Sequence, residues 1–170
     1  MVRKAQSQDA PEIAGLVNSA YRGDSSRRGW TTEADLLDGQ RTDVANIREI
    51  IETPDTQMLV LDNGKFLIGC VMIKTQGSKL YLGMLTVNPE IQNKGYGRVL
   101  MEAAEDEARR QNLTAIEMTV IHHRESLLNY YFRQDYKLTG ERRPFPKTDP
   151  RFGIPKVADL EFLVLEKKLR

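Results

Sequence analysis

The sequence contains little cysteine and no long apolar run, and both absences restrict the class of protein. Cys70 is the single cysteine among 170 residues, so no disulfide can form within the chain and a reducing compartment is expected. No apolar stretch approaches the roughly 20 residues that a membrane-spanning helix requires. The first residues lack the apolar segment of a secretion signal, so we expect a cytoplasmic protein without a membrane partner.

Net charge is also nearly absent. Lys and Arg together number 25 and Asp and Glu number 24, which leaves a formal net charge of +1. This balance predicts no nucleic-acid partner, because non-specific binding of nucleic acid depends on a basic surface. Hydrophobic residues make up 40% of the chain and charged residues 29%, as is typical of a globular protein. We therefore expect residues 1–170 to form a single domain with a substantial core.

Apolar residues at helical spacing predict several amphipathic helices. They are expected over residues 10–22, around 33–37, along Val44, Ile47 and Ile51, over 97–111 and over 125–133. Asp9 is predicted to cap the first helix, with Glu12 completing a capping box. The buried side of the helix over 97–111 is predicted to carry Val99, Leu100, Ala103 and Ala108. In the last helix Leu127, Leu128 and Tyr131 are expected to face inward.

The remaining apolar segments read as strands. They are expected over residues 1–6, 58–61, 65–74, 80–87, 115–121, 136–139 and 160–166. Residues 142–156 contain four prolines and are predicted to be a long irregular loop. Cys70 lies within an apolar strand and is expected to be a small core residue. The order of elements predicts a mixed α/β fold, with helices on the faces of one sheet.

A glycine-bearing turn between a strand and a helix is the most informative segment. The apolar strand over residues 80–87 is followed by a polar turn, then by Gly95 and Gly97, and then by the helix. The first turn of a helix offers unpaired backbone N–H groups and a partial positive charge. Glycine lets the backbone approach a ligand closely. The segment therefore predicts a binding site for a phosphate or pyrophosphate, with Lys94 and Arg98 adding positive charge beside it.

The spacing of the glycines distinguishes between phosphate ligands. A P-loop requires Gly-Lys followed by Ser or Thr, and Gly97 is followed by Arg98. The dinucleotide fingerprint requires a third glycine where Leu100 stands. The pattern that fits is Gln-x-x-Gly-x-Gly, given by Gln92, Gly95 and Gly97, directly after a strand that ends in Leu-x-Val-x-Pro. This segment resembles the coenzyme A pyrophosphate loop of the GNAT superfamily, the Gcn5-related N-acetyltransferases.

The resemblance implies a fold, a cosubstrate and a set of contacts. It implies a mixed, mostly antiparallel sheet in which the two central parallel strands, 80–87 and 115–121, splay apart to hold the thioester of acetyl-coenzyme A. The backbone at Leu85 and Val87 would bind the pantetheine arm and polarise the thioester carbonyl. The cofactor-binding residues implied in the strand and loop are Leu85, Thr86, Val87, Gln92, Asn93, Lys94, Gly95, Tyr96, Gly97 and Arg98.

A second part of the family pattern follows downstream. Family members have a Tyr-x-x-x-Gly-Phe pattern at the end of the next helix, and Tyr131 occupies the place of the tyrosine. Asp135 and Tyr136 stand where glycine and phenylalanine are usual. Aspartate adopts the left-handed conformation more readily than most residues, so we expect the turn to survive. Where many members have an asparagine that touches the cofactor, this chain has Arg124, which can pair with a phosphate instead.

The resemblance implies that Tyr131 is the acid that protonates the departing thiolate. Tyr130 is the competitor if the helix is rotated, and core packing against Leu127 is the alternative for Tyr131. Glu117 lies among apolar residues of a strand and is a candidate base, although an exposed strand face explains it almost as well.

Two further segments bear on the acceptor. His122 and His123 are candidate bases, with exposed loop positions as the simpler interpretation, and they predict no metal site without other ligands. Trp30 and Glu33 lie in a segment that borders the acceptor site in the family, where they would hold a cationic amine. A capped helix start with Glu33 in its first turn is the simpler alternative. The loop over 142–156 would cover this site or merely connect two strands.

These observations favour an acetyl-coenzyme A-dependent N-acetyltransferase. The acceptor would be a primary amine of a small molecule or a peptide, attacking the thioester directly. The alternative from a different class is a catalytically silent domain that binds acyl-coenzyme A as a sensor. Tyr131 favours the enzyme, whereas Arg124 and the lack of an unambiguous base leave room for the sensor. A homodimer through an edge strand or a helix face is compatible with the sequence.

Overall fold

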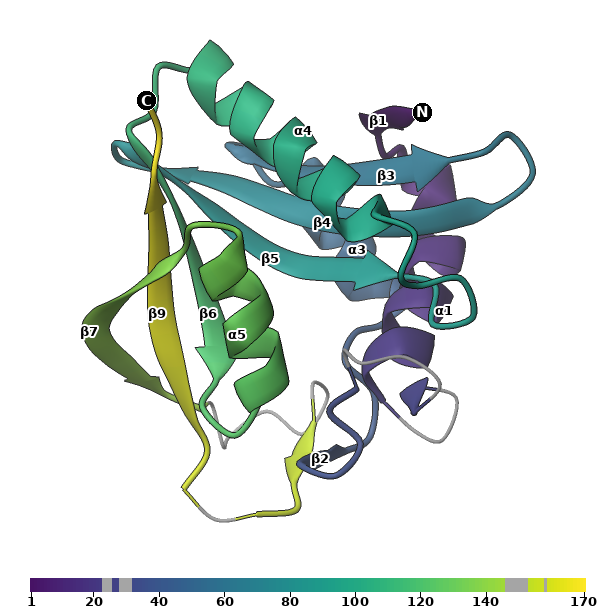
Figure 1. Ribbon diagram of the computed structural model, residues 1–170. Helices are drawn as coiled ribbons and strands as arrows, with labels where there is room; N and C mark the ends of the chain where they lie inside the picture. The colour runs from purple at the N-terminus through teal and green to yellow at the C-terminus, as the bar shows by residue number, and fades with distance from the viewer. Residues whose placement is uncertain (23–25, 28–31, 146–152, 158) are drawn as a thin grey trace.

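The computed structural model describes residues 1–22, 26–27, 32–145, 153–157 and 159–170. Its centre is a seven-stranded sheet with the order β1-β3-β4-β5-β6-β9-β7 (Figure 1). The strands are β1 (Val2–Lys4), β3 (Thr56–Asp62), β4 (Leu67–Gln76), β5 (Lys79–Val87), β6 (Ala115–Ile121), β7 (Lys137–Pro144) and β9 (Glu161–Lys168). Strands β5 and β6 are the parallel pair, and the other neighbours in this sheet are antiparallel. A second sheet pairs β2 (Leu37–Asp38) with β8 (Ile154–Pro155).

Helices cover both faces of the large sheet. One face packs against α1 (Ala10–Tyr21) and α3 (Val44–Glu52), and its core includes Ile13, Val17 and Ile47. The other face packs against α4 (Tyr96–Arg110) and α5 (Glu125–Arg133) around a larger core. A 3-10 turn, η1 (Ser7–Asp9), precedes α1. The predicted fold class is therefore confirmed. None of the described helices is long and apolar enough to cross a bilayer.

The parallel strands β5 and β6 separate soon after they begin. Their pairing covers Lys79↔Ala115, Leu80↔Ile116 and Tyr81↔Glu117. Beyond that point the two strands diverge (Figure 1). A β-bulge in β5 accompanies the divergence, because Cys70 pairs with Thr86 but Met72 pairs with Gly83. The extra residue falls around Met84, whose φ of 51° is in the left-handed region. The predicted splay between the central strands is thus present.

Most element boundaries agree with the sequence pattern, and two differ for reasons of tertiary contact. Residues 33–37 do not form a helix, because a single turn ends where Leu37 enters β2 opposite Pro155. The loop predicted over 142–156 contains strand residues at both ends, since β7 continues through Pro144 against β9 and Ile154–Pro155 form β8, while 146–152 lie outside the described residues. Pro144 is compatible with this strand because β7 is at the edge of the sheet.

The predicted capping box of α1 is wrong. The Asp9 carboxylate accepts hydrogen bonds from the Gln6 N–H at 2.7 Å and from Arg3, so it closes the preceding 3-10 turn. The Glu12 carboxylate accepts from the Leu67 N–H at 2.7 Å and ties α1 to β4. Asp9 thus serves the turn before α1, and Glu12 serves a partner 55 residues away, in place of the reciprocal pair that the spacing predicted.

Two predicted core positions can also be compared with the structure. Val99 is 41% exposed, so its predicted place on the buried side of α4 is wrong. Leu100 and Ala108 are buried as predicted, and Met101 and Ala104 complete the apolar part of that side. Cys70 is fully buried, as predicted.

Candidate active site

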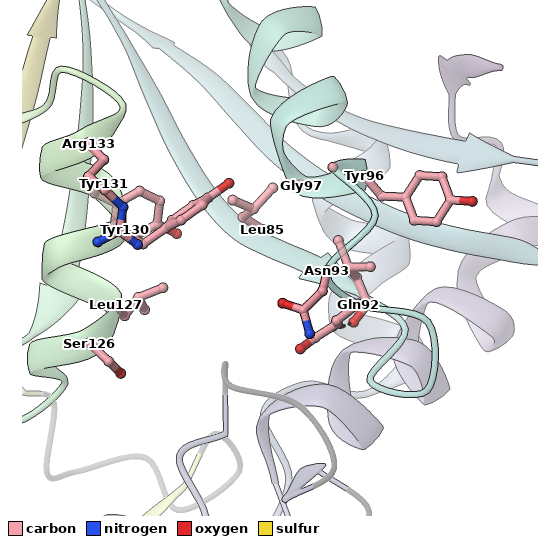
Figure 2. A pocket seen from close by; sticks show the side chains of 12 residues that line it. Leu85, Gln92, Asn93, Tyr96, Gly97, Ser126, Leu127, Tyr130, Tyr131 and Arg133 are labelled. Atoms are coloured by element: carbon pink, nitrogen blue, oxygen red, sulfur yellow. Dashed lines mark hydrogen bonds between the residues drawn. The ribbon is translucent and has the colours of Figure 1, made fainter.

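A cavity of about 460 Å³ lies between the start of α4 and the side of α5. Figure 2 shows the side chains of α5 facing those of the turn before α4 across an open space. The cavity is lined by Leu85, Val87, Gln92, Asn93, Gly95, Tyr96, Gly97, Ser126, Leu127, Tyr130, Tyr131 and Arg133. Seven of these residues come from the strand end and loop that the sequence singled out.

The loop that forms one wall takes its shape from left-handed residues. Gly95 has a φ of 79° and is the N-cap of α4, and Asn93 has a φ of 68°. The Gln92 side chain donates a hydrogen bond from Nε2 to the Val87 carbonyl oxygen at 3.1 Å, which ties the loop to the end of β5. Gln92 therefore has a structural role in the loop, and the first turn of α4 lies beside the cavity with its N-terminal N–H groups.

Gly97 lines the first cavity, whereas the basic residues Lys94 and Arg98 lie on the surface. A Cβ atom at Gly97 would lie 3.6 Å from the Tyr130 hydroxyl and 3.8 Å from a Val87 methyl, so a larger side chain would project toward the cavity wall. Lys94 and Arg98 are exposed and are not among the described lining residues. Arg98 pairs with Glu102 at 3.0 Å on the surface of α4.

A second, smaller cavity of about 160 Å³ lies where β5 and β6 have separated. Leu85, Leu127 and Tyr131 line both cavities, so the two spaces meet at the opening in the sheet. The second cavity is lined by Tyr21, Glu33, Arg41, Tyr81, Leu82, Gly83, Met84, Leu85, Met118, Thr119, Val120, Ile121, Arg124, Leu127, Tyr131 and Phe162. Sequence reasoning missed Tyr21 and Arg41, because helical spacing and charge alone do not indicate which long-range neighbours they reach.

Tyr131 lies between the two cavities. Its side chain is 5% exposed, and its ring makes edge contacts with Tyr130 and Tyr136 at centroid distances of 5.4 and 5.9 Å. Burial raises the pKa of Tyr131 well above its ordinary value of 10.0. Its hydroxyl has no hydrogen bond to another residue in the part of the chain that is described. The phenol is thus kept protonated and directed to a space where a ligand can lie.

The turn after α5 supports this position. Asp135 has a φ of 70°, so it adopts the left-handed conformation expected at the family's glycine. The Tyr136 N–H donates to the Tyr131 carbonyl oxygen at 3.1 Å, and the Tyr136 side chain is only 1% exposed. The segment Tyr131–Tyr136 therefore ends the helix, and the ring of Tyr136 packs against that of Tyr131.

The end of β5 is held from the opposite face of the sheet. The Tyr21 hydroxyl donates a hydrogen bond to the Leu85 carbonyl oxygen. Thr86 is fully buried, and its hydroxyl donates to the Met84 carbonyl oxygen at 2.8 Å. Thr86 therefore stabilises the bulge and does not present its side chain to the first cavity, where the sequence had placed it among the contacts.

Arg124 and Glu33 form an ion pair, which changes both of their predicted roles. The Arg124 Nη1 atom lies 3.4 Å from Glu33 Oε2, and both side chains are 8% exposed. Arg124 lines the second cavity and not the first, so it is displaced from the predicted phosphate contact. Glu33 also pairs with Arg22 at 3.1 Å, so its carboxylate is engaged by two guanidinium groups.

Glu117 is not brought to the reaction site. Its carboxylate accepts from Arg143 at 2.8 Å, and it is not among the described residues that line either cavity. The His122 ring contacts the backbone of Glu161. Trp30 lies outside the described residues. The predicted base Glu117 is thus an ion-pair partner of the edge strand β7.

The sheet opens between its parallel strands, the glycine-bearing turn before α4 lies on one side of the opening, and the buried Tyr131 lies at the opening itself. The chain belongs to the acetyltransferase (GNAT) family, whose model matches residues 15–136. Comparison with curated protein sequences gives no significant match. The predicted family and enzyme class are confirmed.

Solved structures of N-acetyltransferases share the fold at low sequence identity. The ribosomal-protein-S18-alanine N-acetyltransferase from Escherichia coli is 13% identical, with a TM-score of 0.71 over 99% of this chain and 92% of its own. The ribosomal-protein-alanine N-acetyltransferase from Brucella melitensis is 17% identical, with a TM-score of 0.71 over 99% of each chain. The PaiA N-acetyltransferase from Thermoplasma acidophilum, solved with coenzyme A, is 16% identical, with a TM-score of 0.68 over 99% and 98%.

Proposed function

We propose that this chain transfers the acetyl group of acetyl-coenzyme A to a primary amine of a small molecule or a peptide. The observation that carries the proposal is that the two cavities share Leu85, Leu127 and Tyr131 at the opening between β5 and β6. One cavity would hold the cosubstrate and the other the acceptor. The reacting atoms would then meet beside the Tyr131 hydroxyl.

Acetyl-coenzyme A is the cosubstrate that fits the family and the first cavity. The turn before α4 and the N-terminal N–H groups of that helix suit a pyrophosphate, because Asn93 and Gly95 hold the backbone in left-handed conformations. The apolar residues Leu85, Val87 and Leu127 suit the pantetheine arm. A neighbour of the same fold was solved with coenzyme A.

The chemistry is a direct attack. The nitrogen of a neutral amine forms a bond to the thioester carbonyl carbon, the carbon–sulfur bond breaks, and the proton released by the amine passes to solvent water, from which Tyr131 is reprotonated after the transfer. Tyr131 donates its hydroxyl proton to the departing thiolate. A pKa raised by burial keeps the phenol protonated, so the acid is ready over the whole neutral range.

Binding and turnover test the two halves of the proposal. Calorimetric titration of the purified protein with acetyl-coenzyme A is expected to show a single site, with ATP and NADH as controls that do not compete. Release of the thiol in the presence of a panel of primary amines is then expected to identify acceptors. Binding without turnover on any amine would favour the silent sensor, and absence of binding would reject the role of the loop.

A further inference from the structure

The second cavity carries an excess of positive charge. Among the described residues that line it, Glu33 is the one carboxylate, whereas Arg41 and Arg124 are both guanidinium groups. Both oxygens of Glu33 are already engaged. Oε1 accepts from Arg22 at 3.1 and 3.3 Å, and Oε2 accepts from Arg124 at 3.4 Å. The carboxylate thus serves two arginines, and no second carboxylate accompanies Arg41 among the described lining residues.

Arg41 is held at this place by its backbone. The N–H groups of Arg41 and Thr42 both donate to Asn18 Oδ1, at 2.7 and 3.0 Å, and Asn18 Nδ2 donates to the Thr42 carbonyl oxygen at 2.9 Å. Asn18 lies on α1, one turn before Tyr21. The backbone at Arg41 is therefore fastened to α1, which fixes the point from which the side chain extends.

The guanidinium of Arg41 faces the cavity beside an aromatic ring. Its Cζ atom lies 5.8 Å from the centroid of the Tyr21 ring, and that of Arg124 lies 5.7 Å from the same centroid. Within the described ranges, the Arg41 side chain makes no ion pair with a carboxylate. A half-buried cation is costly unless an opposite charge accompanies it, and cation–π contact offsets only part of that cost.

We infer that the acceptor is a small amine that also carries an anionic group, a carboxylate or a phosphonate, which Arg41 binds in the second cavity. This inference rests on the proposed function of the site. The anionic group would lie toward Arg41 and the amine toward the opening between β5 and β6. The cavity volume of about 160 Å³ is below the range of drug-sized ligand sites, so it suits a small molecule better than a peptide.

Matched pairs of amines test the anionic group. Glycine, β-alanine, 4-aminobutyrate and 2-aminoethylphosphonate are each compared with their uncharged amide or alcohol counterparts by the rate of thiol release. At least one anionic amine is expected to exceed its counterpart in kcat/KM by tenfold or more. Arg41→Gln should lower that value by about tenfold to a hundredfold, through KM, which is the range for losing a charge-assisted hydrogen bond. The uncharged counterparts should be unaffected by the substitution.

Arg48→Gln is the matched control. Arg48 is exposed on α3, so its substitution removes the same charge without touching the cavity. Thermal melting of both variants verifies that they fold. An equal rate for charged and uncharged amines, an equal loss for both in Arg41→Gln, or a preference for peptides would overturn the inference while leaving acetyl transfer intact.

A binding measurement separates this inference from the proposed function. The same anionic amines are titrated into the protein saturated with coenzyme A, a condition in which no acetyl group is present. Binding in the wild type that is lost in Arg41→Gln supports the anion site even if no amine turns over. Absence of binding by every anionic amine overturns it. The phosphonate and the carboxylates are measured separately, so their affinities show which anion the site accepts.

Discussion

The hydroxyl of Tyr21 donates a hydrogen bond to the carbonyl oxygen of Leu85, and this bond joins the last turn of α1 to the strand end where the two cavities meet. Both residues are 8% exposed. The hydroxyl of Tyr136 is also buried but has no hydrogen-bond partner in the described part of the chain. These two tyrosines therefore form a matched pair for measuring the contribution of one hydrogen bond.

Tyr21→Phe is expected to lower the free energy of unfolding by about 1–3 kcal/mol, because the Leu85 carbonyl would remain buried without its partner. Tyr136→Phe should leave the stability unchanged or raise it slightly, since it removes an unsatisfied polar atom. Urea unfolding followed by circular dichroism measures both. Equal losses in the two variants would show that the Tyr21 hydrogen bond contributes nothing specific.

Tyr131→Phe is expected to lower kcat by roughly a hundredfold or more with little change in affinity for acetyl-coenzyme A, because it removes the proposed acid. Tyr130→Phe is the control from the adjacent position, since Tyr130 lines the first cavity alone. If Tyr130→Phe carries the larger loss, the proton donor is Tyr130 and Tyr131 is a packing residue.

The pH profile gives an independent reading of the same group. A phenol acts as an acid only while it is protonated, and burial raises the pKa of Tyr131 above 10.0. The rate should therefore not fall from loss of this proton below about pH 10. A fall in rate near pH 8 that is absent from the pH profile of Tyr131→Phe would contradict the raised pKa of Tyr131.

Gly97→Glu is expected to abolish binding of acetyl-coenzyme A without unfolding the protein, because its side chain would enter the first cavity beside Val87 and Tyr130. Gly97→Ala should bind within about threefold of the wild type, since the distances of 3.6 and 3.8 Å are ordinary contacts. Gly15→Glu on the exposed side of α1 controls for the added charge. Calorimetry that shows normal affinity in Gly97→Glu would reject the loop as the pyrophosphate site.

Glu117→Gln is expected to leave kcat within about threefold and to lower stability by no more than about 1 kcal/mol, because the carboxylate forms a partly exposed ion pair with Arg143. Steady-state kinetics on any accepted amine checks the first value and urea unfolding the second. A loss of a hundredfold in kcat would restore Glu117 as the base.

Alkaline conditions should destabilise the fold through buried acidic groups. Burial raises the pKa of the Cys70 thiol from 9.0 to about 12. The thiol stays protonated in the folded protein while it ionises in the unfolded chain, so stability is complete below pH 9 and is lost as the pH rises from 9 toward 12. The slope for one group cannot exceed about 1.4 kcal/mol per pH unit. Unfolding at pH 8, 9 and 10 should show a shallower slope in Cys70→Ala than in the wild type.

Local patterns predicted those parts of the fold whose contacts are themselves local. The strand over residues 115–121 and the helix over 125–133 begin and end where periodicity indicated. The helix expected at 33–37 fails because Leu37 pairs with Pro155, a partner more than a hundred residues away. No helical or strand period contains that information.

The candidate site likewise combines residues that local motifs indicate with residues that only long-range contacts bring together. The glycine-bearing turn and Tyr131 could be singled out because short sequence motifs mark them, and they line one cavity. Glu33 and Arg124 lie 91 residues apart, and only the folded chain shows that they neutralise each other. Arg41 gave no signal in the sequence at all, because its role depends on Asn18 and Tyr21 from another element.

The short parallel pairing of β5 and β6 leaves the sheet open beyond Tyr81. The strands remain joined at Lys79–Tyr81, and at the opening Leu85, Leu127 and Tyr131 are the described residues that line both cavities. Under the proposed function each cavity would hold one substrate, and the acetyl group would pass between them at this opening without either partner leaving its own cavity.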